Sequence, residues 1–310
     1  MNRQVAKSDG ILLLTALIWG VAFVAQRVGM EFVGPFTFNG IRFALGSLVL
    51  VPFILKNNYA ERRRPAPGFR EIGWGGAAAG VVLFTGASLQ QVGLVFTTAG
   101  NAGFITGLYV VFVPVLGLFF GQKTDAGTWL GTFLAASGLY LLSITEGFHI
   151  AFGDLLELLG AFVWAGHVLI IGWLSPRFSA VKLAFFQFAA CSALSLATAA
   201  LFEPIALTAV YHAGIPILYG GLLSVGVAYT LQVVAQKNAH PTHAAILLSL
   251  EAVFAAIGGG FLLGETLTTR GFIGCALMLS GMLLSQLWGS LQAAGSFRKN
   301  LFGRLSSKRP

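Results

Sequence analysis

Long apolar runs, separated by short polar breaks, divide the whole chain. A bilayer core about 30 Å thick requires about 20 apolar residues per helix, and the runs have about that length. They are continuous rather than alternating, which favours spanning helices over the strands of a barrel. We therefore expect ten spans, over residues 8–30, 37–56, 72–94, 98–120, 126–144, 153–174, 180–201, 214–235, 242–264 and 270–291. The break near Phe96–Thr97 is the weakest of these divisions.

The composition agrees with this pattern, because 56% of the residues are hydrophobic and only 10% are charged. Such a mixture lacks the polar surface that a soluble domain needs. The loops are too short for a soluble catalytic or receptor domain, and no cleavable signal peptide is expected. Cys191 and Cys275 both fall inside spans, where we expect them to serve as small packing residues rather than as a disulfide or metal site.

Basic residues gather on one side of the predicted ladder of spans. Only Arg270 falls on the other side, while Arg27 and Arg42 lie within spans. The positive-inside rule then predicts that both termini are cytoplasmic. The alternative, that Arg62–Arg64 and the basic tail at 293–310 bind nucleic acid, is weaker, because topology and anionic lipid already explain such clusters. The residues on the basic side are Arg3, Lys7, Lys56, Arg62, Arg63, Arg64, Arg70, Lys123, Arg177, Lys182, Lys237, Arg298, Lys299, Arg304, Lys308 and Arg309.

The second half of the chain repeats features of the first. A shift of 145 residues aligns Asp9 with Asp154, Trp19 with Trp164 and Phe43 with Phe188, and a shift of 143 aligns Ala102 with Ala245, Gly121 with Gly264, Gly131 with Gly274, Ser137 with Ser280 and Gly138 with Gly281. Each repeat has five spans, an odd number, so the second copy is inverted in the membrane. We expect repeats at 1–145 and 146–292, an arrangement typical of secondary transporters with a site near the midplane between the halves.

Polar residues at membrane depth are costly unless they face a cavity or one another. Helical spacing sorts the polar and aromatic residues of several spans onto shared faces. On the sixth span Glu157 and Trp164 are seven residues apart, with His167 adjacent. The plainer alternative for a lone His such as His167 is an interhelical hydrogen bond. The candidate substrate-cavity residues are Trp19, Gln26, Ser88, Gln91, Asn101, Tyr109, Trp164, His167, Gln187, Tyr229 and Gln232.

Trp19 and Trp164 are repeat mates in the middle of their spans, away from the interface where Trp usually lies. They suit the walls of a cavity for a flat apolar or cationic ligand, although they could equally be packing residues. Glu251 is a candidate for proton coupling, and a structural ion pair or hydrogen bond, with Arg42 or a polar neighbour, is the alternative that we favour. We expect Arg42 to be a structural partner in the first place and an anion contact in the second.

The sequence resembles the drug/metabolite transporter superfamily, in its EamA-type branch of ten-helix exporters, and in particular bacterial aromatic amino acid exporters. The resemblance covers residues 9 to 288. The residues that carry it are Asp9, Trp19-Gly20, Pro35 to Arg42, Thr98-Ala99, Ala102, Pro114-Val115, Gly121, Trp164, Leu250 to Phe254 and Gly264-Glu265. The chain departs from the family pattern at Ala252, where the family often has Pro, and at Gln122 and Gln187, which argues against polar groups acting as symmetric pairs.

The resemblance implies an all-α polytopic protein of ten transmembrane helices in two inverted five-helix repeats, in a bacterial inner membrane. It also implies export of small organic solutes, with aromatic or apolar amino acids as the expected substrates and drug-like cations or sugar conjugates as the alternative. No nucleotide-binding loop, metal-ligand spacing or nucleophile elbow is present in the sequence, so we expect no enzyme activity, metal or cofactor. The expected partners are the solute, the lipid bilayer and, if Glu251 couples transport, a proton gradient.

Two other classes of protein remain as alternatives. A membrane-embedded lipid-handling enzyme would need Asp, Glu or His clustered at one interface, whereas the acidic residues here are scattered. A structural or sensory scaffold would need neither inverted halves nor polar stripes on several helices.

Overall fold

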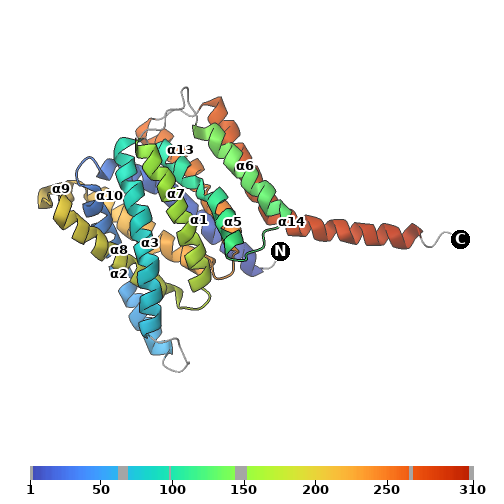
Figure 1. Cartoon of the computed structure of the whole chain (residues 1–310), viewed down its shortest axis with the longest axis horizontal. Helices are drawn as coiled ribbons and strands as arrows, with labels where there is room; N and C mark the ends of the chain where they lie inside the picture. The colour runs from blue at the N-terminus through green and yellow to red at the C-terminus, as the bar shows by residue number, and fades with distance from the viewer. Residues whose placement is uncertain (1–2, 62–68, 98, 144–151, 265–267, 307–310) are drawn as a thin grey trace.

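The computed structural model of the chain describes the backbone of residues 3–61, 69–97, 99–143, 152–264 and 268–306. Within them it is a bundle of helices, and the start of α1 and the point where α14 leaves the bundle lie at the same end (Figure 1). Thr98, Glu265, Arg62, Arg63, Arg64, Lys308 and Arg309 lie outside these residues, and the side chains of the whole predicted tail at 293–310 are not described.

The predicted spans correspond closely to observed helices, except that the last helix continues past the predicted end at 291 to Ser306 and that a short helix, Leu207–His212, lies between the predicted spans 180–201 and 214–235. In the first half these are α1 Arg3–Gly29, α2 Pro35–Glu61, α3 Phe69–Phe96, the pair α4 Ala99–Gly107 and α5 Tyr109–Phe119, and α6 Ala126–Ser143. In the second half they are α7 Phe152–Leu174, α8 Ala180–Phe202, α9 Leu207–His212, α10 Gly214–Leu218, the π-helix η1 Tyr219–Tyr229, α11 Thr230–Ala235, α12 Pro241–Leu248, α13 Glu251–Leu263 and α14 Thr269–Ser306.

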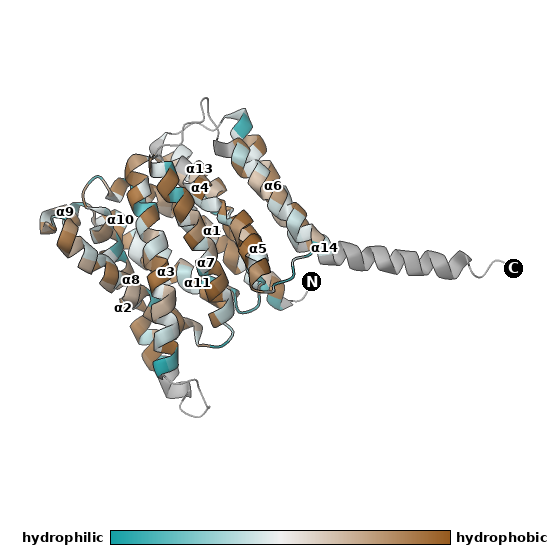
Figure 2. Cartoon of the chain, viewed as in Figure 1, coloured by the Kyte–Doolittle hydropathy of each residue, from teal (hydrophilic) through white to brown (hydrophobic). Residues whose placement is uncertain are grey.

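Among the described residues, 8 helical segments are long and apolar enough to cross a membrane. The two remaining predicted spans are α6 and the apolar start of α14, Thr269–Ser285, which pack against each other. The outward faces of the bundle are rich in apolar residues (Figure 2), including Leu48 and Phe133 with 62% and 68% of their surface exposed. Lipid tails suit such a surface, so the chain is a multi-pass membrane protein.

Contacts between the halves show the inverted repeat directly. Helix α2 packs on its repeat mate α8, and α6 packs on its mate α14. Gly131 approaches the carbonyl of Gly281, while Gly138, the mate of Gly281, approaches the carbonyl of Gly274, the mate of Gly131. Reciprocal contacts of this kind define a two-fold interface between equivalent elements. At the α2–α8 interface the mates Phe43 and Phe188 also meet, with ring centroids 6.2 Å apart.

Three spans depart from a regular α-helix. The fourth breaks at Leu108, where the Leu108 N–H donates to the Ile105 carbonyl, and the ninth breaks at Ser249–Leu250, where the Leu250 N–H donates to the Leu247 carbonyl. Both bonds span three residues, as in a 3₁₀ turn, and the two breaks fall within two residues of equivalent repeat positions, because the shift of 143 residues aligns Leu108 with Glu251. The eighth span contains η1. Tight or wide turns inside a helix often mark functional hinges, and all three lie beside the cavity described below.

The α6–α14 contact leaves no room for a side chain at Gly138. A Cβ there would lie 2.8 Å from Met278 Cγ and would also press on the backbone of α14, whereas a Cβ at Gly166 of α7 meets nothing within 4 Å. We predict that Gly138→Ala has a lower thermal unfolding midpoint in detergent than Gly166→Ala, because overpacking at Gly138 lowers the free energy of unfolding by about 1–3 kcal/mol. Both changes gain the same helix propensity, so equal midpoints would contradict the close contact.

Candidate substrate cavity

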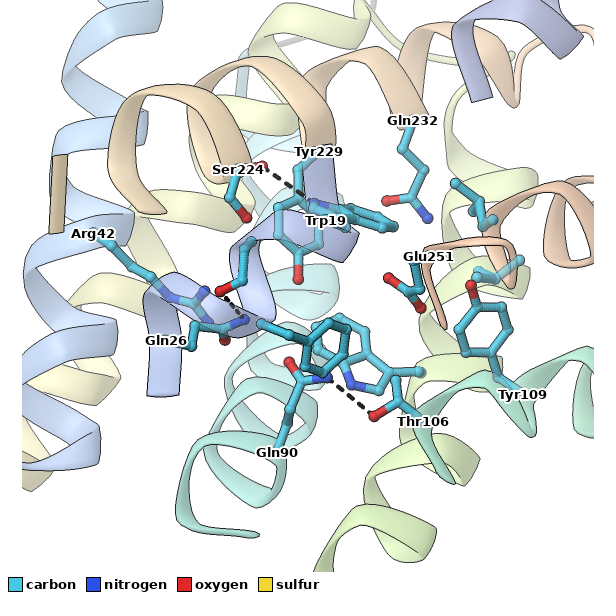
Figure 3. A pocket seen from close by; sticks show the side chains of 15 residues that line it. Trp19, Gln26, Arg42, Gln90, Thr106, Tyr109, Ser224, Tyr229, Gln232 and Glu251 are labelled. Carbon is cyan, nitrogen blue, oxygen red and sulfur yellow. Dashed lines mark hydrogen bonds between the residues drawn. The ribbon is translucent and has the colours of Figure 1, made fainter. Parts of the chain in front are cut away.

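A cavity lies between the two repeats, lined by residues of α1, α2, α3, the α4–α5 pair, α7, η1, α11, α12 and α13 (Figure 3). The structure brings eight of the residues singled out from the sequence to its walls. They are Trp19, Gln26, Arg42, Tyr109, Trp164, Tyr229, Gln232 and Glu251. The cavity is narrow, with a volume of about 30 Å³ open to water-sized molecules.

Three aromatic rings form one wall. The centroid of Tyr229 lies 4.5 Å from that of Trp19 and 6.0 Å from that of Trp164, to which it is stacked. The Trp19 Nε1–H donates to the carbonyl of Ser224 in η1, at 3.3 Å, whereas the buried Trp164 Nε1 has no hydrogen-bond partner. Gly86 of α3 makes room for Trp164, because a Cβ there would lie 3.2 Å from its ring. The repeat mates therefore meet through Tyr229.

Arg42 enters the cavity from α2, although only 1% of its surface is exposed. Its Nε donates to Asn39 Oδ1 at 2.9 Å, and Asn39 Nδ2 in turn donates to the Ala87 carbonyl of α3. The guanidinium carbon lies 5.0 Å from the centre of the Phe43 ring, while Nη2 has no hydrogen-bond partner. The guanidinium is thus held in place through Nε, while Nη2 remains free to bind a ligand in the cavity.

Glu251 is the first residue of α13, directly after the break in the ninth span. Its carboxyl points into the cavity on the side opposite Arg42, with Tyr109 beside it (Figure 3). The two residues form no ion pair with each other, so the structural alternative of an Arg42–Glu251 pair is absent here. The cavity therefore has a cationic pole and an acidic pole with aromatic rings between them.

Other predicted residues lie outside this lining. His167 and Gln187 are fully buried behind the aromatic wall and bond each other, His167 Nε2 to Gln187 Oε1 at 2.9 Å. Gln91 Nε2 donates to the Gln26 backbone carbonyl at 3.5 Å. Ser88 is half-buried away from the lining, and the side chain of Asn101 lies outside those the structure describes.

Helical spacing missed several lining residues. Gln90, Thr106 and Ser224 line the cavity. Gln90 is adjacent to Gln91, so a shift of one residue in the assumed face would have found it, whereas single hydroxyls in apolar runs give little signal. Glu157, on the same predicted face as Trp164, is absent from the lining and is instead fully buried against α3 and α4.

Polar contacts join helices at both ends of the bundle. Asp9, near the start of α1, bonds His243 near the start of α12, with 3.0 Å between Oδ1 and Nε2. Its repeat mate Asp154, near the start of α7, accepts a hydrogen bond at 2.8 Å from the Thr97 hydroxyl, just before α4. The inverted repeat thus places one such contact at each end, with the cavity between them.

Comparison with known proteins gives a family for both halves. A model described as the EamA-like transporter family matches residues 7–144 and again residues 151–287. An uncharacterized transporter of Archaeoglobus fulgidus is 33% identical over 277 residues, covering 89% of this chain and 84% of the relative. The uncharacterized inner membrane transporter YedA of Escherichia coli K12 is 25% identical, with 92% of each chain covered.

Two further matches bear on substrate and fold. A probable amino-acid metabolite efflux pump of Escherichia coli K12 is 28% identical over 171 residues, about half of each chain. A solved structure with 20% sequence identity has a TM-score of 0.75 and covers 91% of this chain and 97% of its own, which shows that the fold is shared. With the ten-span inverted repeat and the family matches in both halves, the chain belongs to the EamA-like transporter family.

Proposed function

We propose that the protein is a secondary transporter that exports small organic solutes, chiefly aromatic or apolar amino acids and related metabolites, by alternating access around the cavity. The observation that carries the proposal is the composition of this cavity between two inverted halves. Its aromatic wall, available guanidinium and separate carboxyl lie together at the junction of the repeats. Secondary transporters place their substrate site at such a junction.

The chemistry of the walls suits a flat, partly charged solute. The rings of Trp19, Trp164 and Tyr229 offer stacking to an aromatic side chain. The unpartnered Nη2 of Arg42 can donate to a carboxylate, and Glu251 can accept from an ammonium group or hold a proton. The amino-acid efflux pump among the partial matches supports the same substrate class.

The small volume of the cavity supports a mechanism in which the helices move apart to admit the solute. Pockets that hold drug-sized ligands have volumes of about 300–1,000 Å³, so the helices must separate before an amino acid fits. The breaks beside Leu108 and Leu250 lie within two residues of equivalent repeat positions, next to Tyr109 and Glu251. Bending at one break and then at the other would open the cavity to one side of the membrane at a time.

The charge distribution supports an orientation. We propose that both termini are cytoplasmic, because the basic residues fall on the side of the predicted ladder where α1 begins. We also propose that the protein lies in a bacterial inner membrane. The match to an inner membrane transporter supports this location. Drug-like cations or sugar conjugates are the second candidate substrates, favoured by the cation–π surface of the aromatic wall.

Flux through proteoliposomes tests the function. Vesicles containing the purified protein and loaded with radiolabelled phenylalanine or leucine should release it faster than protein-free vesicles. Trp164→Ala should slow release about 10-fold, the equivalent of about 1.4 kcal/mol of lost contact. Trp173→Ala is the matched control, since Trp173 lies on the same helix with 61% of its surface exposed and outside the lining. If no amino acid is transported, the amino-acid substrate class is wrong, and drug-like cations and sugar conjugates become the first candidates.

Substitution of Arg42 gives a separate test. A buried guanidinium with an unpartnered nitrogen costs free energy at membrane depth, so it is not expected there for stability alone. Arg42→Met should abolish amino-acid flux while leaving the thermal unfolding midpoint unchanged or higher, since apolar replacements of buried charges are often neutral or stabilising. Arg177→Met, at an exposed position near the end of α7, should retain flux. A large loss of stability with flux retained would instead assign Arg42 a structural role.

A further inference from the structure

A second carboxyl lies close to the cavity without lining it. Glu157 of α7 has no exposed surface, and its Oε2 accepts a hydrogen bond from the Thr106 hydroxyl at 3.0 Å, while Oε1 has no partner. Among the residues that the structure describes, it takes part in no ion pair. An ionised carboxyl without a cation is costly at membrane depth, so this position favours a carboxyl that carries a proton for part of its working cycle.

Hydrogen bonds connect Glu157 to the cavity. Thr106 lines the cavity and accepts a hydrogen bond at 3.1 Å from Gln90 Nε2, another lining residue (Figure 3). A threonine hydroxyl both donates and accepts, so Thr106 joins water or solute in the cavity to the carboxyl behind it. Thr106 and Tyr109 also flank the break at Leu108, which places this hinge between Glu157 and Glu251.

Further polar side chains lie between Glu157 and the nearer end of the bundle. Asp154 precedes it by one helical turn, a spacing at which side chains are neighbours, and Asp154 Oδ1 accepts from the Thr97 hydroxyl at 2.8 Å. Gly93 of α3 provides space for the carboxyl, because a Cβ there would lie 2.7 Å from Glu157 Oε1. In the proposed orientation this end faces the outside of the cell.

The other charged and titratable groups on the neighbouring helices do not contact Glu157. Arg27 of α1 donates through Nη1 to the Leu94 carbonyl, one residue from Gly93. Tyr109 of α5 lies beside Glu251. Arg70 and Glu71 at the start of α3, and His243 near the start of α12, belong to the opposite end of the bundle.

We propose that Glu157 is the proton-binding site of this transporter. It takes up a proton from the outer end through Asp154 and Thr97, and releases it toward the cavity through Thr106 when the hinge at Leu108 opens the other way. One proton would then enter as one solute leaves, which leaves Glu251 free to contact the solute. This inference rests on the proposed function and names the ion that drives it.

Transport with and without a pH gradient tests the proposal. Proteoliposomes at equal pH on both sides should exchange internal for external phenylalanine in both the wild type and Glu157→Gln, within about twofold, because exchange requires no net proton movement. An acidic outside should accelerate net efflux in the wild type, with entry of protons reported by a trapped pH-sensitive dye. Glu157→Gln should lose both the acceleration and the proton entry, and Thr106→Val should weaken them. Glu71→Gln, at an exposed position of α3, is the matched control.

Retention of gradient-driven efflux and proton entry in Glu157→Gln would overturn the proposal, while intact exchange would leave the proposed function standing. Infrared titration in nanodiscs decides the proton site independently of any substrate. The wild type should show a carbonyl band of a protonated carboxyl that disappears on titration, and Glu157→Gln should lack that band. Identical spectra would overturn the assignment even if phenylalanine were not a substrate.

Discussion

The cost of an unpaired polar group at membrane depth is the constraint on which this structure depends. Several polar side chains in the bundle form hydrogen bonds locally: Asn39 bonds a carbonyl of α3, His167 bonds Gln187, and Gln236 bonds the Val168 carbonyl. Arg42 bonds Asn39 through Nε but leaves Nη2 without a partner, and both Arg42 and Glu251 reach the same cavity. Their position identifies the cavity as the place where a solute or water completes the polar contacts.

Close helix packing follows from a second property of lipid, which provides no hydrophobic force to press helices together. Glycine lets the backbones approach instead, as Gly131 and Gly138 do at the α6–α14 contact. Gly131 contacts the repeat mate of Gly138, and Gly138 contacts the repeat mate of Gly131. The interface that holds the halves together is therefore two-fold symmetric. Two such halves can exchange shapes, and the cavity at their junction can then face either side.

Most bounds of the spans could be predicted to within about five residues, because lipid requires a long apolar run for each crossing and short polar segments end it. The end of the tenth span could not, since α14 continues to Ser306, past the predicted end at 291. The Trp19–Trp164 pair also followed from the repeat, and the structure joins the two through Tyr229. Nothing in the apolar run signals the wide turns of η1 or the break at Leu108, since these depend on packing between helices. The same limit applies to Glu157: spacing placed it on the face of Trp164, but its carboxyl lies behind the cavity wall, where Gly93 leaves room and Thr106 donates a hydrogen bond.

Distance measurements between spin labels at the two ends of the bundle test alternating access most directly. One pair of labels, at Phe120 and Lys237, reports the end of the bundle where α1 begins, and a second pair, at Phe32 and Phe261, reports the opposite end; all four positions are exposed. The native Cys191 and Cys275 would first be replaced by Ser, with flux retained. In nanodiscs, adding phenylalanine should lengthen one distance and shorten the other. Distances that stay fixed, or that change in the same direction at both ends, would contradict a cavity that opens to one side at a time.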